Sequence, residues 1–111
     1  MNGNYLGTMA GTGANIDIFC GFKPGKIEVF NRTSTGLEKL EWYYGMADGS
    51  AIKTIAAGTR SLITTLGITI LEDAAKGQGF RIGVDTDINV AAEQLVVIAH
   101  RGTAGNQEPK N

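Results

Sequence analysis

The fold is decided by the stretch Gly79-Phe80-Arg81-Ile82-Gly83-Val84-Asp85-Thr86-Asp87-Ile88-Asn89-Val90, in which an apolar residue or a threonine occupies every second position from 80 to 90. Successive side chains of a β-strand point to opposite faces, so this alternation predicts one strand with an apolar face on the core. The outer face would then carry Arg81, Asp85, Asp87 and Asn89. The stretch predicts a protein built from pleated sheet.

Shorter segments rich in Ile, Thr and Val recur on both sides of this stretch, and 16 glycines with only two prolines punctuate them. They lie at 16–20, 26–29, 61–65, 68–71 and 95–100, and a further segment of alternating pattern covers 37–44. Many short strands separated by turn residues are typical of β-sandwiches and barrels. We therefore predict an all-β, single-domain β-sandwich or jelly-roll-like barrel of about eight short antiparallel strands.

The chain of 111 residues has the length of one domain. Residues 1–14 are rich in Gly, Asn, Thr and Ala, which predicts a flexible N-terminal arm. Residues 102–111 are polar apart from one alanine, which predicts a disordered C-terminal tail. The β-sandwich domain is expected over 15–101.

Two groups of residues receive structural roles from their patterns. Trp42, Phe80 and Ile82 fall on the apolar faces of predicted strands, so we expect them to anchor the core. The segment 95–99 is apolar on both faces, which suits a central strand or a strand with one face in a subunit interface. The predicted interface residues are Val96, Ile98 and His100.

Charge and cysteine usage argue against several classes of function. The formal net charge is −1 and no basic run is present, so no nucleic-acid partner is expected. A single cysteine and the lack of a signal-peptide pattern suggest synthesis in a reducing cytoplasm without export. The sequence has no window of 18 continuous apolar residues, so we expect no membrane partner.

Candidate catalytic, metal and cofactor sites are weak. The segment 85–89 imitates the start of a calcium loop, but Val90 and Val96 stand where that loop needs a glycine and a bidentate carboxylate; an ion shared between subunits stays open. Gly11-Thr12-Gly13 lacks the strand and helix of a dinucleotide loop. Cys20 is expected to be a small buried hydrophobe rather than the partner of His100 in a dyad. We predict no cofactor, no metal and no catalytic residue.

The aromatic run Trp42-Tyr43-Tyr44 leaves an alternative open. Alternation places Trp42 and Tyr44 on the core face and only Tyr43 on the outer face. The core is the expected place of this run. An outward aromatic ring could instead stack on a sugar.

A series of short motifs resembles, in its order, small virion structural proteins of tailed bacteriophages. The motifs are Gly21-Phe22-Lys23-Pro24, Ile27-Glu28-Val29, Glu41-Trp42 followed by Gly45-Met46-Ala47-Asp48-Gly49, Gly67-Ile68-Thr69-Ile70, Gly79-Phe80-Arg81-Ile82-Gly83 and Ala99-His100-Arg101. The resemblance covers about 21–101, and the proteins that share it are similar to head decoration, or cement, proteins. The polar stretch after Arg101 is not part of the pattern.

The resemblance implies a structural role. Decoration proteins as a class sit on the outside of an icosahedral capsid, often as trimers, and hold neighbouring capsomers together. The expected partners are therefore the major capsid protein and further copies of this chain, with the virion capsid surface as the location. The resemblance carries no catalytic residues. The alternative is a tail, baseplate or fibre component that binds host-surface carbohydrate.

Overall fold

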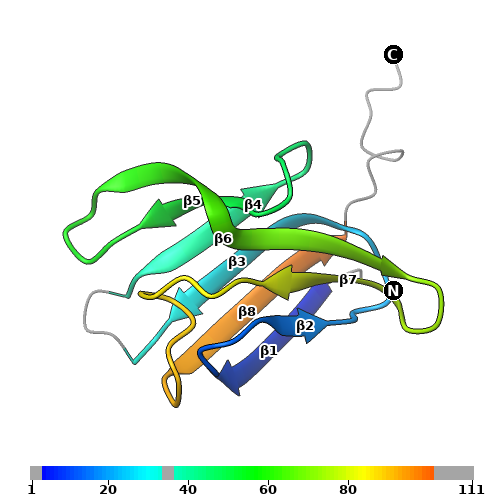
Figure 1. The fold of residues 1–111 in the computed structure, drawn as a ribbon, viewed down its shortest axis with the longest axis horizontal. Helices are drawn as coiled ribbons and strands as arrows, with labels where there is room; N and C mark the ends of the chain where they lie inside the picture. Colours follow the sequence, from blue (N-terminus) through cyan, green and yellow to red (C-terminus); the bar gives the residue numbers. More distant parts are fainter. Residues whose placement is uncertain (1–3, 34–36, 102–111) are drawn as a thin grey trace.

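The computed structural model describes residues 4–33 and 37–101, which form an all-β domain (Figure 1). Its eight strands form one sheet in the order β1-β8-β3-β4-β5-β6-β7-β2, and all neighbouring strands are antiparallel. They are β1 (Asn4–Ala10), β2 (Ile16–Ile18), β3 (Pro24–Asn31), β4 (Lys39–Tyr43), β5 (Ser50–Thr54), β6 (Arg60–Asp73), β7 (Gly77–Ile82) and β8 (Gln94–Arg101). The predicted all-β class with eight antiparallel strands is confirmed.

The sheet curls over on itself through the long strand β6. The first part of β6 pairs with β5, and the part from Ile68 onward pairs with β7. Between them the chain turns at Leu66, which has φ 65°, and at Gly67, where a Cβ would lie 2.5 Å from the Ser50 carbonyl oxygen. Only glycine fits such a close approach of two backbones. The second part of β6, β7 and β2 therefore cross in front of β3 and β8 (Figure 1).

The core fills the space between these two layers. Trp42 is 3% exposed, and Phe80 and Ile82 are fully buried, so all three expected anchors lie in it. The ring of Tyr5 on β1 meets Phe80 edge-on, with 6.4 Å between ring centroids. Alternate residues of the facing strands complete the core, among them Ile27, Val29, Leu40, Ile68, Leu95, Val97 and Ala99.

The strand predicted over 80–90 is wrong beyond Ile82, where β7 ends. The Asp85 carboxylate accepts a hydrogen bond from the Asp87 amide at 2.9 Å, and the Asp85 carbonyl accepts one from the Asn89 amide at 2.9 Å. A side chain that bonds the backbone two residues on closes a turn and competes with an extended strand. Asp85 and Asn89 are consequently buried, at 5% and 2% exposure, instead of lying on an outer face.

Asn89 joins two connections that lie far apart in the sequence. Its Oδ1 accepts hydrogen bonds from the amides of Thr12 and Gly13, at 2.9 and 3.3 Å. Its Nδ2 donates to the carbonyls of Ala14 and Gly83, at 2.6 and 2.9 Å. Every polar atom of this buried amide therefore has a partner, as burial requires.

The flexible arm predicted over 1–14 is wrong for Asn4–Ala10, which is strand β1 and pairs with β8 along its whole length. Composition alone suggested an arm because residues 1–14 as a whole are rich in Gly, Asn, Thr and Ala. The backbone ladder to β8 and the inward side chains of Tyr5 and Met9 hold it instead. The domain thus includes Asn4–Ala10 instead of starting at residue 15. The predicted tail over 102–111 lies outside the described residues.

Candidate functional site

The broadest candidate surface is the solvent side of β1, β8, β3, β4, β5 and the first part of β6, which we call the outer face. Residues directly opposite each other on neighbouring strands share a face, so the register defines a continuous row across it. This row is Leu6, Ile98, Glu28, Glu41, Ile52 and Leu62. Its two ends are strongly exposed hydrophobic side chains, with Leu6 at 72% and Leu62 at 64%.

The predicted interface residues Val96, Ile98 and His100 all lie on this outer face. They alternate along β8 with the buried Leu95, Val97 and Ala99 and are themselves half-buried in the single chain. His100 Nδ1 lies 3.2 Å from Asn4 Oδ1 on the neighbouring strand. Their role in a subunit interface stays a prediction.

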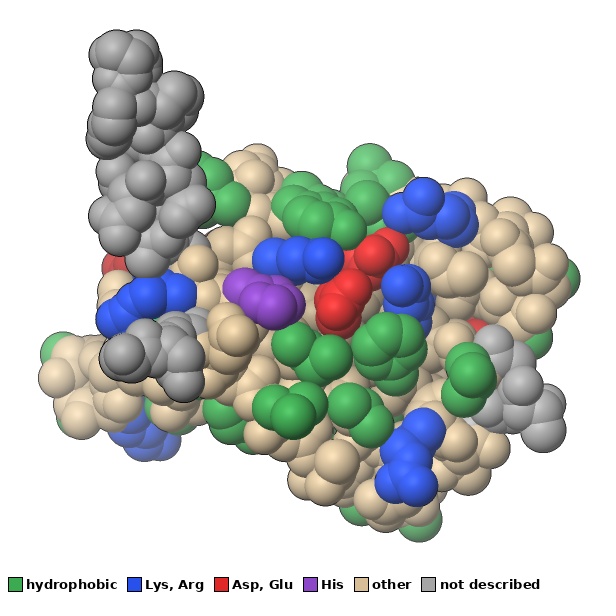
Figure 2. Space-filling model, turned by 180° about the vertical axis from the view of Figure 1, so that it is seen from behind, with side chains coloured by type: hydrophobic (Ala, Val, Ile, Leu, Met, Phe, Trp, Pro, Cys, Tyr) green, Lys and Arg blue, Asp and Glu red, His purple; other side chains and the backbone are tan. Residues whose placement is uncertain are grey.

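The two glutamates at the centre of the outer face form ion pairs with basic side chains of the same chain. Glu28 and Glu41 stand opposite each other on β3 and β4. Lys26 lies 3.7 Å from Glu28, while Lys39 and Arg60 lie 3.5 and 3.1 Å from Glu41. Figure 2 shows acidic side chains near the middle of the visible face, with basic and hydrophobic ones around them. The outer face therefore combines hydrophobic area with charges that are already paired.

The pairing also sets the protonation of Glu41. Burial alone raises the pKa of this carboxyl, but the hydrogen bond from Tyr43 and the charges of Lys39 and Arg60 outweigh burial, so the pKa lies below its ordinary value of 4.5. A pKa lowered by folding contributes stability above the unfolded value and loses it as pH falls through the folded value.

We therefore expect Glu41→Gln to flatten the acid limb of the stability curve. In urea unfolding followed at pH values from neutral to below 4.5, the ordinary pKa of Glu41, the wild type should lose stability more steeply than the variant. Glu72→Gln is the matched control, because Glu72 is an exposed carboxylate paired with Lys23 at 3.5 Å. Equal acid slopes for wild type and Glu41→Gln would contradict the assignment.

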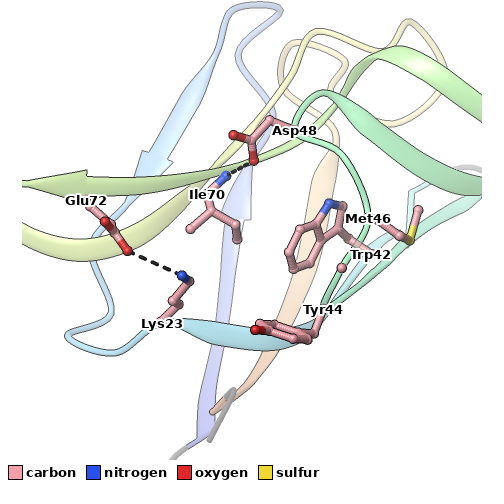
Figure 3. Close-up of a pocket in the computed structure, with 8 residues that line it drawn as sticks. Lys23, Trp42, Tyr44, Met46, Asp48, Ile70 and Glu72 are labelled. Atoms are coloured by element: carbon pink, nitrogen blue, oxygen red, sulfur yellow. Dashed lines mark hydrogen bonds and ion pairs between the residues drawn. The ribbon is translucent and has the colours of Figure 1, made fainter. Parts of the chain in front are cut away.

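A second candidate site is an open pocket of about 470 Å³ beside the end of β4 (Figure 3). One wall is formed by Trp42, Tyr44 and Met46, and the other by Ile70, Glu72 and Lys23. Asp48 closes one end, where its Oδ1 accepts a hydrogen bond from the Ile70 amide at 3.0 Å. Figure 3 shows the Lys23–Glu72 ion pair across the pocket from the two aromatic rings.

The pocket corrects the expectation for Tyr44. Tyr44 follows Trp42 by two residues and lines the same pocket, but it extends past the end of β4 and is 60% exposed instead of buried. Tyr43 lies on the outer face, as expected, and is half-buried there. Its hydroxyl donates to Glu41 at 3.1 Å, and the Lys26 ammonium lies 5.6 Å from its ring centre. The open aromatic ring is therefore Tyr44.

The remaining sequence candidates do not converge on a site. The carboxylates of Asp85 and Asp87, from the segment that imitates a calcium loop, both form ion pairs with the ammonium of Lys53, at 2.9 and 2.7 Å. The Cys20 thiol donates to the Phe22 carbonyl at 3.4 Å and packs against the core, whereas His100 lies on the outer face. Residues 4–33 and 37–101 contain no cluster of three or more potential metal ligands. No helix in this part of the chain could span a membrane.

Comparison with family models, with curated proteins and with solved structures finds no match to the chain.

Proposed function

We propose that this chain is a head decoration protein of a tailed bacteriophage, which binds the outside of the capsid and holds neighbouring capsomers together. The observation that carries the proposal is the outer face, a sheet surface that spans six strands and exposes Leu6 and Leu62 at its two ends. The order of the sequence motifs supports the same class.

The physics of the outer face suits permanent contact with another protein. Exposed hydrophobic side chains on a broad surface mark interaction sites. Burying them in a contact is favourable by about 25 cal/mol for each Å² of apolar surface removed from water. Charged groups usually oppose such burial, since removing them from water is costly. Here Glu28 and Glu41 already have cationic partners within the same chain, so they reach an interface with part of that cost offset.

In this proposal the outer face binds the major capsid protein. Many copies on one particle would make individually weak contacts strong in total. Self-association into trimers, as in the decoration class, remains part of the proposal.

The test is binding to capsids assembled from the major capsid protein of the source phage. We expect the wild-type protein to co-sediment with them and to saturate at a fixed number of copies, in multiples of three. The double variant Leu6→Asp, Leu62→Asp should bind about tenfold more weakly or worse, because each change places a carboxylate in the contact. Both positions are strongly exposed in the single chain, so the fold should be kept.

The control is Leu66→Asp, at the bend of β6 outside the row that defines the outer face. Leu66 is 49% exposed and has φ 65°, a conformation that aspartate tolerates. This variant should bind capsids like the wild type. Failure of the wild-type protein to bind capsids, or equal loss in control and double variant, would refute the proposal.

A further inference from the structure

We infer that the pocket beside β4 is a saccharide-binding site that takes one neutral sugar ring of a larger glycan. This inference is independent of the decoration function, because the pocket and the outer face share none of the residues that carry either argument. The pocket volume of about 470 Å³ lies within the range of small-molecule sites, roughly 300–1,000 Å³.

The first argument is the state of Tyr44. It is a large aromatic side chain that is 60% exposed, although it directly follows a strand whose other inward residues are buried. Its amide donates to the Gly25 carbonyl at 2.7 Å, so the backbone is fixed up to this residue. The chain then reverses at Gly45, whose φ of 95° is a backbone conformation that residues other than glycine rarely adopt. The backbone thereby presents at the pocket a ring that is largely open to solvent.

The second argument is the rigid wall behind Tyr44. Trp42 is almost fully buried, and its Nε1 donates to the Ala47 carbonyl at 3.3 Å, which ties the indole to the turn that frames the pocket. The backbone bond from the Met46 amide to the Tyr43 carbonyl, at 3.0 Å, closes the same turn. A wall whose shape exists before binding spares the ligand the cost of ordering it.

The third argument is the set of polar side chains that lie across the pocket from the aromatic rings. Lys23 offers hydrogen-bond donors, and Glu72 and Asp48 offer carboxylate acceptors. Lys23 and Glu72 form a 3.5 Å ion pair with side chains 49% and 58% exposed, so both retain contact with water and with a ligand. Asp48 is oriented by its bond from Ile70.

These features together select the ligand class. A sugar ring has an apolar face of C–H groups, which can stack on Tyr44, and a rim of hydroxyls that both donate and accept hydrogen bonds. Charge-assisted hydrogen bonds to carboxylates are stronger than neutral ones. Two carboxylates against one ammonium disfavour an anionic ligand. The open, partly polar mouth fits the end of a glycan better than a wholly apolar molecule.

The test is an NMR titration of the isotope-labelled chain with methyl glycosides of glucose, galactose, mannose and N-acetylglucosamine. We expect saturable shifts for at least one of them, in the amides of Tyr44 to Asp48 and the Trp42 indole, with Kd near the millimolar range that is common for a single weak contact surface. Tyr44→Ala should bind about tenfold more weakly, and Tyr44→Phe should retain most of the affinity.

The matched control is Tyr43→Ala, which removes the neighbouring ring on the outer face and should leave sugar affinity unchanged. An unchanged melting temperature in Tyr44→Ala would show that the loss is local. The inference is overturned if none of the glycosides gives saturable shifts at the pocket, if Tyr43→Ala and not Tyr44→Ala removes binding, or if only a cation such as methylammonium binds there. Capsid binding by Tyr44→Ala should equal that of the wild type, which separates this test from that of the decoration function.

Discussion

Phe80→Ala is expected to lower the free energy of unfolding by about 3–5 kcal/mol, a large share of the roughly 5–15 kcal/mol that stabilises a domain of ordinary size. Phe80 is fully buried at the meeting point of the two layers, where Tyr5 from β1 packs edge-on against it. Its removal loses apolar burial and leaves a cavity that strands fixed on both sides close only in part. Urea unfolding at neutral pH measures the change directly.

Phe19→Ala is the matched control for this result. Phe19 is a half-buried phenylalanine between β2 and β3, and the Lys76 ammonium lies 5.6 Å from its ring centre. The same deletion there should cost much less, because the site can fill with water. If both variants lowered the free energy of unfolding by the same amount, Phe80 would not be a main contact of the core.

Asn89→Leu should have an effect of similar size, about 3 kcal/mol or more, although it replaces a polar side chain with an apolar one of similar size. The leucine cannot replace the four hydrogen bonds that Asn89 makes to Thr12, Gly13, Ala14 and Gly83. Their amides and carbonyls would lose partners in partly buried surroundings. Thermal and urea unfolding would both register the loss.

The control for Asn89 is Asn15→Ala, because Asn15 is an exposed asparagine in the connection that Asn89 holds. This change should alter stability by no more than about 0.5 kcal/mol. Hydrogen exchange adds a local readout: the Thr12 amide should exchange faster in Asn89→Leu and not in Asn15→Ala. Unchanged exchange at Thr12 would mean that another contact holds this connection.

The parts of the fold that sequence reasoning predicted are those in which side chains alone set the pattern. Ile27 and Val29 alternate with charged or half-buried residues, and β3 and β4 form as the pattern indicates. On β8 the apolar residues on both faces separate into the buried Leu95, Val97 and Ala99 and the outer-face residues. In these strands local alternation and tertiary packing agree.

Sequence reasoning failed where a specific hydrogen bond overrides the alternation. From Phe80 to Val90 the apolar period is continuous, yet the Asp85 side chain closes a turn after β7. The signal was present in Asp85-Thr86-Asp87, because aspartate favours turns of this kind. Strand β1 was missed for a different reason: its stability depends on pairing with β8, which lies about 90 residues away along the chain.

The pocket could not be predicted because it depends on where β4 stops. Alternation correctly groups Trp42 with Tyr44 on one side of the strand. It does not reveal that Trp42 is buried whereas Tyr44, which follows the end of β4, stays exposed beside a pocket. The outer face was partly predicted, through Val96, Ile98 and His100, while its extension to Leu6 and Leu62 required the register of the neighbouring strands.

The most direct test of the central claim is a reconstruction of virions of the source phage by electron cryomicroscopy. The account predicts density for this domain on the outside of the head, at junctions between capsomers, with the row from Leu6 to Leu62 against the major capsid protein. Density confined to the tail, or a domain on the head whose outer face points to solvent, would contradict it.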